Sequence, residues 1–381
     1  MAFFTLLLGT KNRPELLRET MQSVVLQDFN DYELIVSDNW NDERTKQVID
    51  SFPDPRIKYI RPDREFNIPD HWDWLIRQAT GEYVFMLTDR SLLCAGALRR
   101  IAAVIREYAP QGVEAYSWNH EIYDGQSGYM RPVAYSSKEV VVCDSNELLL
   151  QYAKKGLIDP RFPQLPNACF DRRLGERIRA QHDRMVFPTA PDLTANCLML
   201  LYTAKVAHIK EPLLISQTAA NSNGATMFEK GPETYFDTLG MTNLYRHVPI
   251  KAPIIQCLNF DDFVTMVHMA GRESLLKEID WATYFMLGYE EMIYFGWSGY
   301  MKRRKKEFMD AWKAGLQTQP SEVQKEVRRR MLRTRIKALT KSILANNPFT
   351  PVLRSLQGIF EYRSRRKYYP NALSAAGFHI V

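Results

Sequence analysis

The sequence predicts an α/β fold, with a mostly parallel, Rossmann-like sheet flanked by helices and a helical, basic C-terminal extension. Three observations support this prediction. Short apolar runs alternate with helical patterns in the N-terminal part of the chain. The run at residues 84–87 shows no polar alternation, which is typical of a strand buried on both faces. Residues 301–369 hold 19 Lys and Arg against 5 Asp and Glu.

Each of the first three predicted strands ends in polar residues, and Pro14 opens a helix after the first of them. Because right-handed crossovers bring the ends of parallel strands to one edge, we expect these polar side chains to line one pocket. Its mixed charge suits a base, a ribose and a diphosphate. The residues are Thr10, Asn12 and Arg13 after residues 3–8; Asp38 and Asn39 after residues 34–36; and Asp89, Arg90 and Ser91 after residues 84–87.

The order of these motifs resembles the nucleotide-binding half of a family 2 glycosyltransferase with the GT-A fold. The segments that carry the resemblance are T-x-N-R-P, then Ser-Asp-Asn, then G-E-Y-x-x-x-L-x-D. The resemblance covers roughly the first hundred residues, within the usual uncertainty of boundaries. It implies that Asp38 accepts a hydrogen bond from the base, usually uracil, and that Asp89 faces ribose and metal. The implied nucleotide-binding set is Thr10, Asn12, Arg13, Asp38, Asn39 and Asp89.

The third motif departs from the family pattern. Where the family places two or more acids, one of them binding a divalent cation, this chain has Thr88, Asp89, Arg90 and Ser91. Asp89 and Ser91 could hold Mn²⁺ or Mg²⁺ weakly, since these ions prefer hard oxygen ligands. Alternatively the ion is dispensable and Arg90 binds the diphosphate, since a guanidinium pairs bidentately with phosphate. A third interpretation leaves Arg90 in solvent or paired with a nearby acid.

Asp192 is the candidate catalytic base. Pro191 and Asp192 precede apolar residues at helical spacing, which places Asp192 at or just inside a helix start. The resemblance implies that an acid in this place deprotonates the acceptor hydroxyl, which predicts inversion at the anomeric carbon. The alternative is a structural role, because Asp is a preferred N-cap residue and its charge favours the helix dipole.

The resemblance also implies a division of the chain and a reaction. Residues 1–110 would form the nucleotide-sugar-binding half, residues 111–225 the acceptor and catalytic-base half, and residues 226–381 a mainly helical extension. The expected activity is sugar transfer from a nucleotide-diphosphate donor, usually a UDP-sugar, to a glycan or lipid-linked acceptor in bacterial surface polysaccharide synthesis. One alternative is a nucleotide-sugar-binding protein that has lost catalysis. A sugar-nucleotide pyrophosphorylase fits less well, because its phosphate loop needs more glycines than Gly9.

Composition favours a globular protein of the cytoplasm. The chain has 381 residues and 45% hydrophobic content, and its five cysteines, 49, 26, 28 and 60 residues apart, include no C-x-x-C. No disulfide framework, zinc site or signal peptide is therefore predicted. The most apolar later stretch, residues 281–297, contains Glu290 and Glu291, so we expect a buried helix and no membrane span.

The excess positive charge lies in the C-terminal extension. Residues 301–369 carry a net charge of +14, which leaves −8 for the rest of a chain of net charge +6. Leu332, Ile336, Leu339 and Ile343 recur there at helical spacing. One interpretation is peripheral attachment to anionic lipid at the inner membrane face, near a lipid-linked acceptor. The other is a solvated helix whose apolar stripe packs on the domain or another subunit. We expect no nucleic acid partner, because no recognition motif accompanies the charge.

Overall fold

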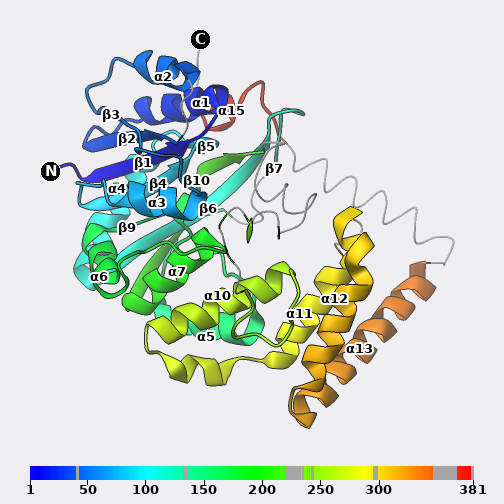
Figure 1. Ribbon diagram of the computed structural model, residues 1–381. Coiled ribbons are helices and arrows are strands. Elements are labelled where there is room, and N and C mark those ends of the chain that lie inside the picture. Colours follow the sequence, from blue (N-terminus) through cyan, green and yellow to red (C-terminus); the bar gives the residue numbers. More distant parts are fainter. Residues whose placement is uncertain are drawn as a thin grey trace.

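Figure 1 shows the computed structural model of the chain, in which helices cover both faces of a central sheet. The structure describes residues 1–39, 43–131, 136–218, 244–294, 299–345 and 367–378, and also residues 233, 236, 237, 239 and 241. Within these ranges the side chains of residues 131, 294, 299–301, 335 and 337–345 are not described.

Four parallel strands form the centre of the sheet. In spatial order they are β3 (Ile57–Ile60), β2 (Tyr32–Asp38), β1 (Phe4–Thr10) and β4 (Tyr83–Thr88). Each neighbouring pair among them is parallel, which confirms the predicted arrangement. β1 runs two residues beyond the predicted apolar run, so that Thr10 is the last residue of the strand.

The central strands are apolar on both faces because successive side chains point to opposite sides of a sheet. Phe85 and Leu87 of β4 pack into one apolar cluster, whereas Val84 and Met86 pack into the cluster on the other face. All four side chains are buried. The lack of polar alternation at residues 84–87 therefore has the cause that the sequence pattern predicted.

Helices supply the partner surface on each face. The cluster of Phe85 includes residues of α1 (Pro14–Val25), α2 (Glu43–Asp50) and α4 (Ala97–Tyr108), which η1 (Ala109–Gln111) follows. The cluster of Val84 includes residues of α3 (Ile68–Ile76), α5 (Ser145–Lys155), α6 (Arg172–His182) and α7 (Pro191–Tyr202). The helix predicted after the first strand begins at Pro14, as expected.

The second half of the chain widens the sheet with strands of both directions. They are β5 (Ser91–Leu93), β6 (Val113–Asp124), β7 (Tyr129–Arg131), β8 (Val140–Asp144), β9 (Ala168–Asp171), β10 (Lys205–Gln217) and β11 (Lys367–Tyr368). After η2 (Leu165–Asn167), β9 enters between β4 and β6 and is antiparallel to both. The long strands β6 and β10 are parallel.

The C-terminal part is helical, as predicted, and it continues the core of α7. α10 (Ile255–Met269) contacts α7, and α11 (Trp281–Tyr294) contacts α10, with η3 (Glu273–Glu278) between them. α12 (Gly299–Gln317) and α13 (Ser321–Ala345) both contact α11, and the short α15 (Ala372–Ala375) contacts α1. In Figure 1, α12 and α13 lie at the side of the molecule away from β1 and β2.

The apolar stretch predicted at residues 281–297 forms a largely buried helix up to residue 294, with Tyr284, Phe285 and Met292 in the core. Residues 295–297 lie outside the described part of the chain. Over the segments that the structure describes, no helix combines the length and the apolar character that crossing a membrane requires.

The buried side chain of Glu33 in β2 forms hydrogen bonds that connect β2 to β1 and to neighbouring residues. Its carboxylate is buried and accepts hydrogen bonds from Lys58 Nζ (2.7 Å) and Thr80 Oγ1 (2.6 Å), and from the hydroxyl of Thr5 in β1. Burial alone would raise the pKa of Glu33, but these hydrogen bonds lower it to about 2. Because the folded-state pKa is depressed, the carboxylate stabilises the fold above its unfolded pKa, and this stabilisation is lost as pH falls towards 2.

We therefore expect Glu33→Gln to lower the free energy of unfolding by ~1–3 kcal/mol at pH 7, the usual cost of a disrupted buried hydrogen-bond partner. Urea denaturation at pH 7, 4 and 2.5 measures this loss, which should shrink as the pH falls. Asp50→Asn, at an exposed carboxylate paired with Lys46, is the matched control and should cost little at any pH. A loss from Glu33→Gln that is constant across the three pH values would contradict the assigned carboxylate role.

Candidate active site at the sheet edge

The ends of β1, β2 and β4 meet at one edge of the sheet. Thr10 lies opposite Asp38 in the register of β1 and β2, and the backbone N–H of Asn39 donates to the Thr10 carbonyl (3.0 Å). On its other side, the Thr10 hydroxyl donates to Asp89 Oδ2 (3.1 Å). The structure thus brings together the polar residues that the sequence places after three separate strands.

Asp89 is the buried carboxylate of this edge. Arg13, at the N-cap position of α1, donates from Nη1 to Asp89 Oδ1 (3.2 Å), so both carboxylate oxygens have hydrogen-bond partners. Burial raises the pKa of Asp89, and the nearby Arg13 charge and the Thr10 hydroxyl oppose this shift. Asn12, which precedes Arg13, is exposed and adopts a left-handed backbone with φ of 55°, a conformation that Asn tolerates.

A second guanidinium lies beside the first. Arg90 is half-buried in the turn between β4 and β5, and its pKa is lowered by burial and then by the charge of Arg13. Two positive charges that approach each other in a partly buried place favour the binding of an anion, because an anion relieves their repulsion. Arg13 and Arg90 therefore form a candidate site for a diphosphate.

The donor set near Asp89 does not fit a divalent cation held by the protein alone. The Asp89 carboxylate already accepts from Arg13 and Thr10, and the Ser91 hydroxyl shares a hydrogen bond of 2.7 Å with Thr88 Oγ1. Within the described part of the chain, no three His, Cys, Asp or Glu side chains cluster in a way that could hold a metal ion. Asp89 and Ser91 offer one carboxylate and one hydroxyl, and such ions prefer more oxygen ligands.

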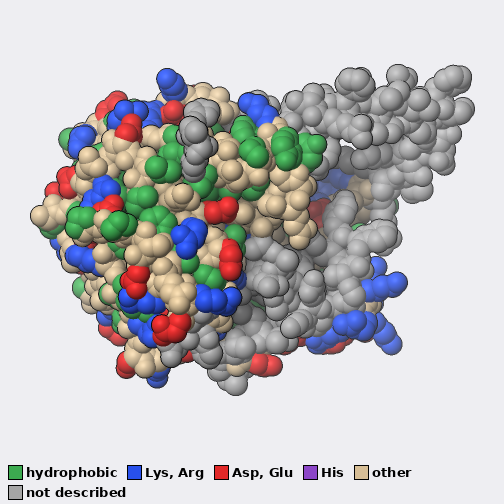
Figure 2. Space-filling model, turned by 90° about the horizontal axis from the view of Figure 1, so that it is seen from above, with side chains coloured by type: hydrophobic (Ala, Val, Ile, Leu, Met, Phe, Trp, Pro, Cys, Tyr) green, Lys and Arg blue, Asp and Glu red, His purple; other side chains and the backbone are tan. Residues whose placement is uncertain are grey.

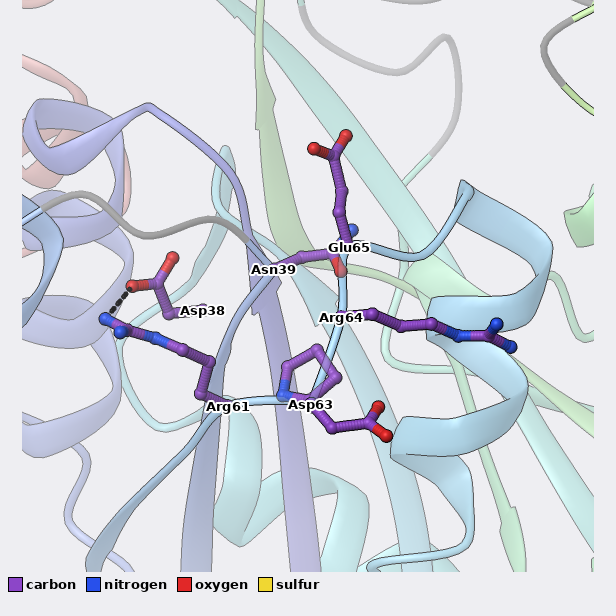
Figure 3. Close-up of a pocket in the computed structure, with 7 residues that line it drawn as sticks. Asp38, Asn39, Arg61, Asp63, Arg64 and Glu65 are labelled. Atoms are coloured by element: carbon purple, nitrogen blue, oxygen red, sulfur yellow. Dashed lines mark hydrogen bonds and ion pairs between the residues drawn. The ribbon is translucent and has the colours of Figure 1, made fainter.

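A pocket of about 310 Å³ opens beside the end of β2. Figure 3 shows the side chains of its wall, which come from β2 and from the loop after β3. Asp38 is fully buried at this wall; its Oδ2 accepts from Arg61 Nη2 (3.1 Å) and from the Tyr59 hydroxyl (3.4 Å). The lining residues are Asp38, Asn39, Arg61, Pro62, Asp63, Arg64 and Glu65.

The pocket loop is fastened to the strand ends. Asn39 donates from Nδ2 to the Phe66 carbonyl (2.8 Å), and its Oδ1 accepts from the Phe66 N–H (3.0 Å). Lys11, in the loop after β1, forms an ion pair with Glu65. Asn39, assigned to the nucleotide from its motif, therefore holds the loop that makes the pocket wall.

The residues that follow β3 were not among the sequence candidates. Arg61, Asp63, Arg64 and Glu65 join the site because β3 is the next parallel strand, and its end lies at the same edge as those of β1 and β2. The polar run R-P-D-R-E between a strand and a helix was the signal that could have identified them.

Asp192 occupies the second position of α7, as its sequence pattern predicted. Ala190 is the N-cap residue, so Asp192 does not cap the helix in the ordinary way. Its side chain keeps part of its surface accessible. Burial raises the pKa of Asp192, and hydrogen bonds from the backbone N–H groups of Leu193 and of Asp192 itself lower this pKa. A carboxylate with a raised pKa at an accessible helix start is suited to accept a proton.

The segment before α7 is tied to the pocket through α3. Arg184 donates from Nη2 to Asp70 Oδ1 (2.8 Å), and Asp73 Oδ1 accepts from the N–H groups of Met185 (2.7 Å) and Val186 (3.2 Å). Asp70 and Asp73 belong to α3, which begins two residues after the Phe66 that bonds to Asn39. The candidate base and the nucleotide pocket thus share one supporting helix.

The turn that leads into α7 is strained. Thr189 adopts φ of 93°, which is a genuine outlier for a β-branched residue and costs on the order of 1–3 kcal/mol. The following N–H, that of Ala190, donates to Asp262 Oδ2 of α10 (3.0 Å). Asp262 is a site residue that the sequence analysis missed, because its motif lies 70 residues after Asp192 in a helix of mainly apolar residues.

The N-terminal third of the chain is similar to proteins of one known family. Residues 5–131 match the profile of glycosyl transferase family 2. A 101-residue segment, 26% of the chain, is 36% identical to the GalNAc(5)-diNAcBac-PP-undecaprenol beta-1,3-glucosyltransferase of Campylobacter jejuni and covers 33% of it. An 81-residue segment, 21% of the chain, is 33% identical to the O-antigen biosynthesis protein RfbC of Myxococcus xanthus and covers 6% of it. The matches thus span a third or less of these relatives.

Solved structures establish the fold. S. aureus TarS 1-349 in complex with UDP-GlcNAc matches with a TM-score of 0.51 at 15% identity, covering 86% of this chain and 84% of that one. The same protein in complex with UDP matches with a TM-score of 0.50 at 14% identity, covering 84% and 93%. The segment 5–131 thus matches glycosyl transferase family 2, and the chain shares the GT-A fold of these structures.

Proposed function

We propose that the protein is an inverting glycosyltransferase that moves a sugar from a UDP-sugar to a hydroxyl acceptor. The observation that carries the proposal is the meeting of polar strand ends at one edge, with a pocket on one side and two guanidinium groups on the other. The profile match to residues 5–131, which include all of these strand ends, supports the same class of reaction.

In this proposal the donor lies along the sheet edge. The uracil occupies the pocket beside Asp38, whose carboxylate accepts a hydrogen bond from the base. The diphosphate lies against Arg13 and Arg90, which neutralise the charge that builds up on the leaving group; such preorganised groups usually supply a large part of catalysis. Thr10, Asn12 and Asp89 line the nucleotide between these two ends. A divalent cation is dispensable here, because the arginines supply the positive charge.

Asp192 acts as the general base. Its carboxylate takes the proton of the acceptor hydroxyl while that oxygen forms a bond to the anomeric carbon. The bond from the anomeric carbon to the diphosphate oxygen breaks at the same time, and UDP leaves with the electron pair. Attack from the face opposite the leaving group inverts the configuration of that carbon. Burial raises the pKa of Asp192, which makes its carboxylate a stronger proton acceptor than an exposed aspartate.

UDP binding tests the nucleotide site and its cation. We expect calorimetric titration to show UDP binding in EDTA as well as in Mn²⁺, and tighter than GDP binding. Arg90→Gln should weaken UDP by roughly 10- to 100-fold, because a charge-assisted hydrogen bond contributes ~1.5–3 kcal/mol. Arg18→Gln, at an exposed arginine of α1, is the matched control. Affinity that requires Mn²⁺ would show that the arginines do not replace the ion, and a lack of binding would remove the assignment of the site.

Asp192→Asn tests the base. We expect the variant to release UDP from UDP-GlcNAc, used as the probe donor, ~10²- to 10⁴-fold more slowly, because general base catalysis contributes that much. Its UDP affinity should match that of the wild type, because Asp192 lies outside the sheet-edge pocket. Asp183→Asn, at a side chain that is 99% exposed, is the control. Unchanged release would contradict the assignment.

A second candidate function is a nucleotide-sugar-binding protein without catalysis. The observation that favours it is the single carboxylate at the end of β4, where Arg13 and Thr10 already occupy the oxygens of Asp89. Product formation distinguishes the two candidate functions. Wild-type protein that binds UDP but releases no UDP from any sugar donor would support the binding protein without catalysis.

We place the acceptor at a membrane surface, as a lipid-linked glycan in bacterial surface polysaccharide synthesis. The name of the Campylobacter relative describes an undecaprenol-linked acceptor, and RfbC is named for O-antigen biosynthesis. In this chain, Val323, Val327 and Met331 of α13 pack against the core, so the packed stripe differs from the one predicted. The predicted stripe is exposed at Leu332 (59%) and Ile336 (52%), and the side chains of residues 339 and 343 lie outside the described part.

Basic side chains surround this exposed apolar surface. Arg328, Arg329 and Arg333 of α13 are exposed, as are four basic residues near the start of α12, namely Lys302, Arg303, Lys305 and Lys306. Figure 2 shows Lys and Arg side chains at the edge of the molecule where Figure 1 places these helices. Lys and Arg near an anionic surface contribute about 1 kcal/mol each, and exposed apolar residues add burial in the lipid. This arrangement supports our proposal of peripheral attachment at the cytoplasmic face of the inner membrane.

Liposome sedimentation tests the membrane surface. We expect the protein to sediment with vesicles that contain phosphatidylglycerol and to stay in solution with phosphatidylcholine alone. Replacing Arg328, Leu332 and Arg333 with Gln, Ser and Gln should lower binding about tenfold or more, given about 1 kcal/mol per charge. A control with Gln at Arg18, Arg99 and Lys205 removes exposed charges elsewhere. Equal binding to both vesicle types would contradict the proposal.

A further inference from the structure

α10 carries two adjacent aspartates that face different segments. Asp262 is buried, and its Oδ2 accepts from the Ala190 N–H (3.0 Å) just before α7. The nearby Thr189 hydroxyl lowers the pKa of Asp262, and it donates to Met241 Sδ (3.9 Å). Asp261 is buried as well, but its Oδ1 accepts from the His247 N–H (2.7 Å). One helix therefore holds two similar buried acceptors, of which only Asp262 contacts the turn that leads to Asp192.

The hydrogen bond from Ala190 to Asp262 lies next to the strained residue of that turn, Thr189. Thr189 has a positive φ, which an L side chain keeps only when its surroundings hold it there. Asp262 accepts a hydrogen bond from the next backbone N–H, that of Ala190, so it holds the peptide group that directly follows the strained residue. Asp192 is two residues further on, at the second position of α7.

The helix that carries Asp262 is itself anchored. Glu291 of α11 is buried and accepts from the N–H groups of Ile255 (2.8 Å) and Gln256 (2.9 Å) at the start of α10. α10 also packs against α7 and α11 in one apolar cluster. Asp262 therefore lies on a well-packed helix and can hold the turn before α7 in one position. A precisely placed functional group needs such support.

We propose that Asp262 is a positioning residue for the general base, and that its hydrogen bond to the Ala190 N–H, next to the strained Thr189, sets where the Asp192 carboxylate lies. This inference rests on the proposed function of Asp192. A displacement of about 1 Å at a reacting group can cost ~10²-fold in rate, so a contact two residues away is close enough to matter. Asp262 lies in the helical part that follows the family match, and it touches no substrate in this assignment.

The charges around Asp262 agree with this role. The acidic groups that face it are Asp192 and Cys197 of α7, Tyr152 of α5 and Asp261 of its own helix. Burial, followed by the charges of Asp261 and Asp192, raises the pKa of Asp262 well above its usual range. Burial and these neighbouring acidic groups thus disfavour a negative charge on Asp262. An asparagine, which is neutral and keeps the acceptor oxygen, can then replace Asp262.

The test compares Asp262→Ala, Asp262→Asn and Asp261→Ala in the full chain. Release of UDP from UDP-GlcNAc in water gives kcat and KM, and hydrogen exchange of residues 187–193 reports on the Ala190 N–H without any substrate. We expect Asp262→Ala to lower kcat at least tenfold, with KM within twofold of wild type, and to exchange faster at residues 187–193. Asp262→Asn should restore both properties. Asp261→Ala, which loses a buried bond of the same kind, should leave both unchanged at temperatures below its melting point.

The outcomes separate this inference from the one on which it rests. Wild-type exchange and kcat in Asp262→Ala would overturn the positioning role, even if Asp192→Asn is inactive. Equal losses in Asp262→Ala and Asp261→Ala would also overturn it, because they would indicate a general loss of helix stability. If Asp192→Asn keeps full activity, the base assignment fails instead. Should UDP-GlcNAc release no UDP, the exchange comparison alone decides whether Asp262 holds the turn.

Discussion

The parallel pairing of β2, β1 and β4 is the constraint on which the rest of this site depends. Because neighbouring parallel strands end at the same edge, Thr10 lies between Asp38 and Asp89, and its backbone carbonyl and hydroxyl bond to both sides. Both faces of these strands are buried, so a slip of one residue would move each core side chain into the apolar cluster on the opposite face and disrupt the packing of both clusters. The core thus places the polar groups at the edge, and hydrogen bonds among Thr10, Arg13 and Asp89 then hold their side chains.

The two ends of this sheet edge differ in their charged groups. At the end of β4, Asp89 is matched by Arg13, and Arg90 adds a second positive charge, whose pKa is lowered by burial and by the charge of Arg13. At the end of β2, the buried Asp38 is matched by Arg61 and Tyr59. A ligand with an uncharged, hydrogen-bonding head and a doubly charged diphosphate is complementary to this pair of ends.

Local pattern was enough to predict the nucleotide half from the sequence. Each strand there is a continuous apolar run, and the strand ends follow from short segments such as T-x-N-R-P, so Thr10, Asp38 and Asp89 were assigned from neighbouring residues alone. Arg61 was missed because β3 is short and only partly buried, which weakens its signal. Asp262 could not be assigned, because its role depends on the packing of α10 against α7 and on a bond to a residue 72 positions earlier. Two adjacent acids in an otherwise apolar helix were the only local sign.

The central claim is that the sheet edge binds a nucleoside diphosphate through its pocket and its arginines. A crystal structure of the protein soaked with UDP tests this claim most directly. The account predicts uracil in the pocket beside Asp38 and diphosphate oxygens within hydrogen-bond distance of the Arg13 and Arg90 guanidinium groups. UDP bound elsewhere, or a diphosphate held away from both arginines, would contradict it.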